Sequence, residues 1–231
     1  MATEWKMMSW NNLASIALVF AAVCLFAGCY EEPVSAEKTV PAEHRVYLKK
    51  MNLSELNAKL VFEMGRVFDS AWTNLSSLVE SFDPKSLDYL NADYNSITNV
   101  DGVLAFTSLK WLRLNHNKLT DLPDLSPLKN LRRIYLKGNL FSKVPETLKS
   151  LPALTDIDLS DNPMLSEIPV WLARKEGLEH LSFSRTKIKQ LPENLSAWRS
   201  LKTLQLGDLM EMLPAELDRI RAALPKTAVV Y

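Results

Sequence analysis

The chain has 231 residues, with 27 Lys and Arg residues against 27 Asp and Glu residues, so its formal net charge is zero at pH 7. A neutral chain has no global field that attracts nucleic acid, and no nucleic-acid partner is expected. Both cysteines, Cys24 and Cys29, lie close to the N-terminus, which excludes a disulfide or a thiolate metal site from the remainder of the chain.

The N-terminal segment carries an apolar run at residues 13–28, which is short for a membrane-spanning helix and fits the core of a signal peptide. The run ends in Ala27-Gly28-Cys29, which resembles the lipobox of bacterial lipoproteins. The resemblance implies that residues 1–28 are a lipoprotein-type signal peptide and that Cys29 is acylated at the mature N-terminus. An uncleaved anchor is the alternative.

A polar segment, residues 29–42, follows the signal peptide and contains prolines but no apolar periodicity. We interpret it as a tether with a reach of about 20 Å if it is flexible. Under the lipoprotein interpretation the protein lies in the bacterial cell envelope. Tyr30 occupies the place where Asp directs retention in the inner membrane of some bacteria, so the resemblance favours the outer membrane.

A leucine-rich spacing returns roughly every 22 to 24 residues, a period typical of stacked repeats. In the repeat that begins at Leu109, Leu112 and Leu114 alternate with Arg113, which predicts a short strand with its leucines turned inward. Stacking such repeats aligns the strands into a parallel sheet over a continuous leucine core. The same frame begins at Leu87, Leu109, Leu131, Leu154, Leu178 and Leu201.

An asparagine follows each of the middle strands at a fixed position. We expect its buried amide to bond backbone groups that would otherwise be unpaired in the turn. Thr186 and Leu209 replace it in the last repeats, so the ladder weakens toward the C-terminus. The asparagines of this column are Asn95, Asn117, Asn139 and Asn162.

Residues 87–224 resemble the leucine-rich repeat superfamily, in the style of bacterial surface and lipoprotein members with Leu-Pro-x-x-Leu segments. The resemblance implies an α/β leucine-rich repeat solenoid, a horseshoe with a parallel sheet on its concave face and 3₁₀ or short helical turns on its convex face. It also implies recognition of other macromolecules on the concave face without identifying the ligand.

The repeat domain is expected to span 43–231. Two worn registers, around Val46 and Phe68, extend the count to about eight repeats, the first two degenerate. The alternative is an amphipathic helix over 53–68 that caps the solenoid. At the other end, a helix that begins at Pro214 and a closing strand over 227–231 form a predicted cap at 214–231.

The outward positions of the strands are available for function because the core does not need them. In three neighbouring repeats they concentrate Tyr, Trp and Arg, the residue types enriched at binding hot spots. The alternative is that these side chains only pack against one another across the sheet. The predicted patch consists of Tyr89, Trp111, Arg113, Arg133 and Tyr135, with Tyr94, His116 and Lys137 at its edge.

Other sites find little support in the sequence. Asp156, Asp158 and Asp161 could hold calcium, but Arg133 should lie beside Asp156, so we expect a salt-bridged face and assign no metal. Catalytic motifs and phosphate-binding glycine loops are absent from the sequence, which predicts neither an enzyme nor a cofactor. Trp198 fills a leucine position and should be core, whereas Trp171 should face outward on the convex side.

The sequence therefore predicts a non-enzymatic, membrane-tethered, extracytoplasmic binding module that recognises a protein or cell-envelope partner on its concave face. The alternative is a structural envelope scaffold without a discrete ligand. An enzyme-targeting domain would need an appended catalytic region, and we expect the short segment after the closing helix to leave no room for one.

Overall fold

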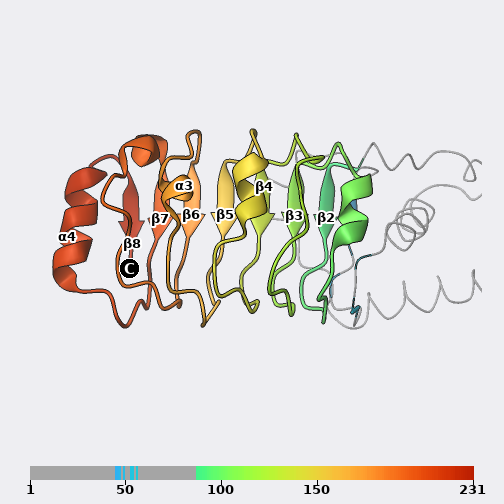
Figure 1. Ribbon diagram of the computed structural model, residues 1–231, viewed down its shortest axis with the longest axis horizontal. Helices are drawn as coiled ribbons and strands as arrows, with labels where there is room; N and C mark the ends of the chain where they lie inside the picture. The colour runs from blue at the N-terminus through green and yellow to red at the C-terminus, as the bar shows by residue number, and fades with distance from the viewer. Residues whose placement is uncertain (1–44, 48, 50–52, 55, 57–86) are drawn as a thin grey trace, which may run out of the picture.

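The computed structural model describes residues 45–47, 49, 53–54, 56 and 87–231. Eight parallel strands form one sheet, and each strand lies next to its neighbour in sequence (Figure 1). This order is that of a solenoid. The strands are β1 Arg45–Tyr47, β2 Tyr89–Asn91, β3 Trp111–Arg113, β4 Arg133–Tyr135, β5 Asp156–Asp158, β6 His180–Ser182, β7 Thr203–Gln205 and β8 Ala228–Val230.

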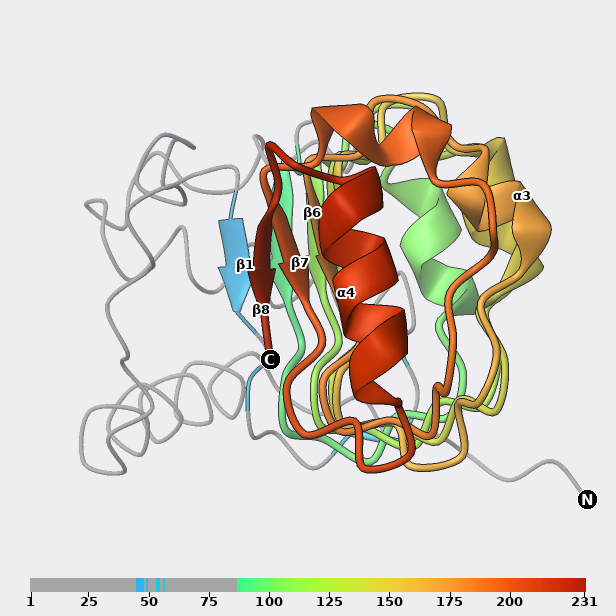
Figure 2. The same ribbon diagram turned by 90° about the vertical axis from the view of Figure 1, so that its left-hand side faces the viewer.

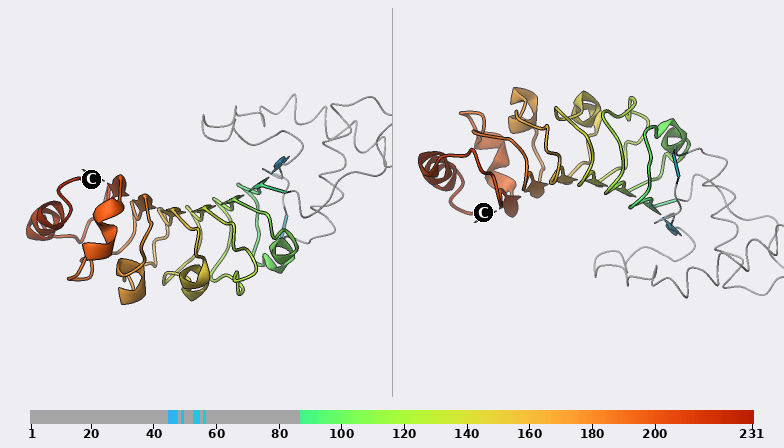
Figure 3. Two further views of the ribbon diagram at one scale, coloured as in Figure 1. Left: turned by 90° about the horizontal axis from the view of Figure 1, so that it is seen from above. Right: turned by 90° about the horizontal axis from the view of Figure 1, so that it is seen from below.

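Short helical segments line the side opposite the sheet. Figure 3 shows the strands on the inner side of the curve and these segments on the outer side, which confirms the predicted concave sheet and convex turns. They are the 3₁₀ helices η4 Asp101–Ala105, η5 Glu146–Ser150 and η6 Ser196–Ser200, and the α-helices α3 Val170–Ala173 and α4 Pro214–Ala223.

The leucine core lies between these two layers. Leu112, Leu114 and Leu136 are fully buried, as the alternation within the strands predicts. Burial of one such side chain contributes about 1.5–3 kcal/mol. Trp198 is also fully buried, and its indole Nε1 donates to the carbonyl oxygen of Leu172 at 2.9 Å, so the prediction that it belongs to the core is confirmed.

The asparagine column forms the predicted ladder beside the sheet. The Asn117 amide nitrogen donates to the carbonyls of Ala92 and Leu114, both at 3.0 Å, and its Oδ1 accepts from the backbone N–H of Ile97. Each asparagine thus connects its own turn to the preceding repeat. In the later repeat Thr186 makes a single bond, from its hydroxyl to the carbonyl of Phe183 at 2.8 Å, as expected for a weaker ladder.

β1 confirms the first of the two worn registers, the one around Val46. The second, around Phe68, was expected to supply the strand beside β2, and this expectation is wrong. β1 pairs directly with β2, and the N–H of Leu53 donates to Asn95 Oδ1 at 3.1 Å, so β1 occupies the place beside β2 that the period assigns to a strand around Phe68. Gly65 and Ser70 stand where that register needs inward apolar residues. Residues 57–86 lie outside the described residues.

The alternative helix does not begin at Leu53. The backbone of Leu53 and Leu56 bonds to the neighbouring repeat, with Leu53 accepting from Ser96 and Leu56 donating to Asn99. Leu53, Ser54 and Leu56 accordingly have no helical structure. The remainder of the predicted 53–68 helix lies outside the described residues.

The C-terminal helix and closing strand form as predicted. α4 begins at Pro214, and Ile220 and Leu224 bury their side chains against the last repeat. Figure 2 looks at this end of the solenoid and shows α4 beside β8. The predicted signal peptide, Cys29 and the predicted tether fall outside the described residues. Among the described residues, no helix has the length and apolar character needed to cross a bilayer.

Candidate functional site

The outward residues of β2, β3 and β4 stand in two straight columns across the sheet. In the first column Tyr89 pairs with Trp111, and Trp111 with Arg133. In the second, Arg113 is flanked by Asn91 on one side and by Tyr135 on the other. The structure therefore brings the five central residues of the predicted patch together, in the predicted register.

The aromatic half of this patch is more buried than expected. Tyr89 and Trp111 meet edge to face, with ring centroids 5.9 Å apart, and the Arg133 guanidinium lies over the Trp111 ring at 4.8 Å. Tyr89 is 0% exposed and Trp111 only 8% exposed. The expectation that both rings present open contact surface is wrong. Trp111 instead packs beneath the Arg133 guanidinium and holds it in place, and Tyr89 packs against Trp111.

Arg113 is fixed by a buried carboxylate that the sequence reasoning missed. Its Nη2 lies 2.7 Å from Oδ2 of Asp93, whose side chain is fully buried and also accepts the N–H of Asn115 at 2.7 Å. Burial raises the pKa of the Asp93 carboxyl, while the Arg113 guanidinium acts in the opposite direction. Continuing the alternation past Ala92 would have placed Asp93 on the outward side, opposite Asn115 and diagonal to Arg113.

Tyr135 lies between the basic and acidic parts of the sheet. The Arg113 guanidinium is 5.6 Å from its ring centroid. Burial raises the pKa of the Tyr135 phenol, and the Asp156 carboxylate acts in the same direction. The phenol therefore stays neutral at physiological pH and can donate a hydrogen bond.

The edge of the patch is a row of turn residues with left-handed backbone. Tyr94 and His116, with φ of 58° and 54°, stack their rings at 4.4 Å, and Tyr94 is 46% exposed. Gly138 continues the row at φ 68°, and a Cβ there would come within 2.5 Å of His116 Nδ1. Glycine at this position therefore leaves room for the imidazole. Lys137 lies beside the row and pairs with Asp161 at 3.4 Å.

The aspartates on β5 and in its turn are mostly engaged by cations. Arg133 lies 3.6 Å from Asp156, as predicted, and the Arg185 guanidinium hydrogen-bonds Asp161 and lowers the pKa of that carboxyl. No group of three or more His, Cys, Asp or Glu side chains is placed to hold a metal within the part of the chain that the structure describes. These contacts fit a salt-bridged face.

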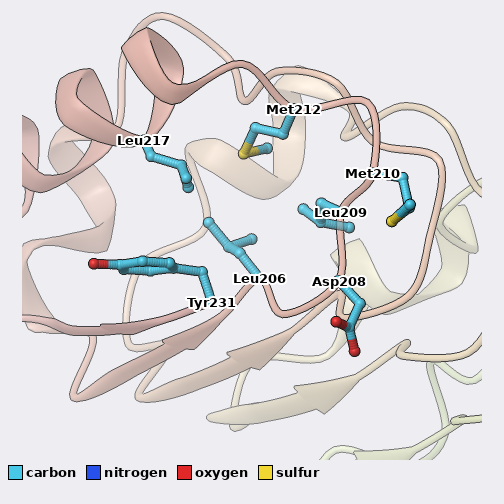
Figure 4. Close-up of a pocket in the computed structure, with 7 residues that line it drawn as sticks. All are labelled: Leu206, Asp208, Leu209, Met210, Met212, Leu217 and Tyr231. Atoms are coloured by element: carbon cyan, nitrogen blue, oxygen red, sulfur yellow. The ribbon is translucent and has the colours of Figure 1, made fainter.

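Two further features lie away from the patch. Trp171 is half-buried on the convex side, where its Nε1 donates to Glu146 at 2.9 Å. At the C-terminal end a shallow pocket forms between β7 and α4, apolar apart from Asp208, with Met210 93% exposed at its rim (Figure 4). Neither arrangement contains paired acid, base or nucleophilic groups.

Comparisons with known proteins agree with this geometry. Residues 85–141 and 107–164 match the family model for leucine rich repeats. A probable serine/threonine-protein kinase of Dictyostelium discoideum is 34% identical over 177 residues, which cover 71% of this chain and 5% of that protein. A disease resistance protein of Arabidopsis thaliana is 35% identical over 153 residues, which cover 64% of this chain and 13% of that protein.

The chain thus spans only a small part of these curated relatives. Among solved structures, an internalin from Listeria monocytogenes has a TM-score of 0.57 at 17% identity, covering 99% of this chain and 72% of the internalin. That likeness shows the fold alone. The family match over residues 85–164 and the parallel sheet agree with a leucine-rich repeat fold for this chain.

Proposed function

We propose that the protein is a non-enzymatic binding module, tethered to a membrane outside the cytoplasm, that engages a protein partner on its concave face. The observation that carries the proposal is the fixed, half-buried cluster of Arg113, Arg133 and Tyr135 on neighbouring strands. Arg and Tyr are enriched at hot spots, where large planar groups bind without much loss of conformational freedom.

The cluster is preorganised for binding. Asp93 holds Arg113 from below at 2.7 Å, and the Trp111 ring supports Arg133 at 4.8 Å. A side chain already held in one conformation loses less entropy when a partner binds, so more of the contact energy remains as affinity. This arrangement favours a binding role over a scaffold, because cross-strand packing alone does not require fixed and accessible guanidinium groups.

The membrane tether is proposed from the sequence at Ala27-Gly28-Cys29, which resembles a lipobox. Two or more acyl chains on Cys29 would make attachment stable. Together with Tyr30 this resemblance supports a location in the envelope of a bacterium, with the outer membrane as the proposed site. A bacterial lipoprotein of this kind would present its repeats to partners within or outside the envelope.

Site-specific photo-crosslinking tests the binding surface. A benzophenone amino acid at position 135 should crosslink the full-length protein to one specific envelope protein, whereas the same group at position 171, on the convex side, should not. Arg133→Ala should weaken capture of that partner by roughly thirtyfold or more, equivalent to about 2 kcal/mol. Arg199→Ala, on the convex η6, is the matched control. Crosslinks from position 171 alone would place the binding surface on the opposite side.

A further inference from the structure

The concave face has opposite charge at its two ends. We define the strand face as the stretches that run from the residue before each strand to the left-handed turn residue after it, for β2 to β7. Over β2–β4 the strand face carries the cations Lys110, Arg113, Arg132, Arg133 and Lys137 against the anions Asp88 and Asp93. Over β5–β7 it carries the anions Asp156, Asp158, Asp161, Glu179 and Asp208 against the cations Arg185 and Lys202.

Close ion pairs within each half leave this asymmetry in place. In the basic half, Lys110 pairs with Asp88 at 3.1 Å and Arg113 with Asp93 at 2.7 Å. In the acidic half, Lys202 pairs with Glu179 at 2.7 Å. Arg185, in the same half, contacts both Asp161 and Asp208. The excess cations lie on β4 and in its turn, and the excess carboxylates lie on and around β5.

The ion pairs that cross the boundary between the halves are longer than most of those within each half. Arg133 reaches across it to Asp156 at 3.6 Å, and Lys137 reaches Asp161 at 3.4 Å. Among the described residues, Arg132 and Asp158 have no ion-pair partner, and the Asp158 carboxylate accepts only the N–H of Ser160, at 2.9 Å. A partly exposed ion pair such as Lys137–Asp161 contributes little to stability, so a ligand can replace it with contacts of its own.

We infer that the partner segment is an extended polypeptide with separated charge blocks, its acidic side chains over β3 and β4 and its basic side chains over β5 and β6. This inference rests on the proposed function. Four strands spaced about 4.8 Å apart span about 14 Å, the length of four or five extended residues. Nucleic acid is disfavoured because its single sign of charge is repelled by the acidic half.

The two unpaired groups give the polarity of the bound segment. Arg132 is exposed just before β4, and the Trp111 ring fixes the orientation of the neighbouring Arg133 guanidinium, a planar group suited to binding a carboxylate. Asp158 offers a carboxylate to a lysine or arginine of the ligand. Tyr135 lies between these two positions, where its neutral ring can contact the uncharged middle of the segment.

Two synthetic peptides of identical composition and zero net charge test the inference. One has its glutamates at one end and its lysines at the other, separated by glycines, and the second alternates them. With the full-length protein at low salt, fluorescence anisotropy should show the block peptide binding about tenfold or more tightly than its alternating isomer. Added salt should reduce the difference, because screening weakens exposed charge pairs.

Matched variants locate the binding. Asp158→Asn retains an acceptor for Ser160 and should lower block-peptide affinity severalfold, whereas Glu167→Gln, an equal charge change in the turn before α3, should not. Arg132→Gln should act like Asp158→Asn, with Arg199→Gln as its control. Melting curves verify that all four variants are folded.

Three results would overturn the inference: equal affinity for both isomers, equal affinity of an all-lysine or all-glutamate peptide and the block peptide, or equal effects of face and control variants. If position 135 still crosslinks a partner in any of these cases, the proposed function stands and only the charge-block inference fails. If position 135 captures nothing either, both fail.

Discussion

Asn117 shows how much one side chain contributes to the register of neighbouring repeats. Its amide group donates to Ala92, Leu114 and Asn115 and accepts from Ile97, all within 3.2 Å. These bonds join two repeats, and the Asn117 Oδ1 satisfies the buried N–H of Ile97. The position of the asparagine column was predictable from sequence because four successive repeats place it at the same distance from the inner apolar residues.

Replacing Asn117 by alanine tests this contribution. Asn117→Ala leaves the buried N–H of Ile97 unpaired and should lower the free energy of unfolding by about 1–3 kcal/mol, measured by thermal or denaturant unfolding. The matched control is Asn130→Ala, because Asn130 is exposed and makes one bond to the carbonyl of Thr107. An unfolding midpoint for Asn117→Ala equal to that of the control would show that the ladder adds no stability.

Burial within the patch was less predictable than register. Alternation within the strand predicts that the Trp111 side chain points away from the leucine core, but it does not predict which side chains cover it. Its 8% exposure results from Tyr89 on one side and from the Arg133 guanidinium on the other. Both contacts join different repeats, and the second depends on the length and rotamer of Arg133. Such contacts do not follow from the period of the sequence.

At the scale of an element, α4 also combines features that follow from the sequence with contacts that do not. Its start at Pro214 and its length follow from local sequence. Its attachment depends on two side chains that reach the preceding repeat: Glu216 accepts the N–H of Leu191 at 2.8 Å, and Arg219 donates to the carbonyl of Leu191 at 3.0 Å. Glu216 and Arg219 also pair with each other at 2.7 Å. This contact between distant segments was not visible in the sequence.

The attachment of α4 should be sensitive to acid. The hydrogen bond from Arg219 lowers the pKa of Glu216 below its ordinary value of 4.5, so this carboxylate stabilises the fold above pH 4.5 and loses its contribution as the pH falls through the folded-state pKa. Glu216→Gln should therefore cost about 1–2 kcal/mol near neutral pH and nearly nothing in strong acid.

Unfolding curves of the parent and Glu216→Gln across the acid range measure this convergence. Asp218→Asn serves as the control, because the Asp218 side chain is 74% exposed on the same helix. A constant difference between parent and Glu216→Gln at every pH would contradict ionisation of Glu216 as the cause.

At the scale of the whole molecule, the period predicted the sheet but miscounted its N-terminal end. From β2 to β7 each strand begins where the leucine frame places it, because a stacked repeat has to present the same inward positions to its neighbours. Upstream, a strict period assigns a strand near Phe68, yet β1 at Arg45–Tyr47 lies directly beside β2. Stacking requires inward leucines rather than a fixed length of chain, so the segment between these strands need not contribute one.

The attachment of the whole molecule to a membrane is tested at Cys29. If this cysteine carries acyl chains, each buried CH₂ contributes about 0.8 kcal/mol to membrane affinity, and two or more chains keep the protein bound. Cys29→Ser removes the thiol to which the chains attach. It should therefore abolish incorporation of labelled fatty acid and move the protein from the membrane fraction to the soluble fraction, with an unchanged melting curve for the repeats.

Cys24→Ser is the matched control for that experiment, because it changes a cysteine inside the apolar run and leaves Cys29 in place. It should keep both the lipid label and the membrane fraction. Mass spectrometry of the N-terminus separates the two models of attachment. If Cys29→Ser remains in the membrane with residues 1–28 still attached, the apolar run is itself an uncleaved anchor and the lipoprotein proposal is wrong. Loss of the label together with release of the protein would identify the acyl chains as the link between the repeats and the envelope.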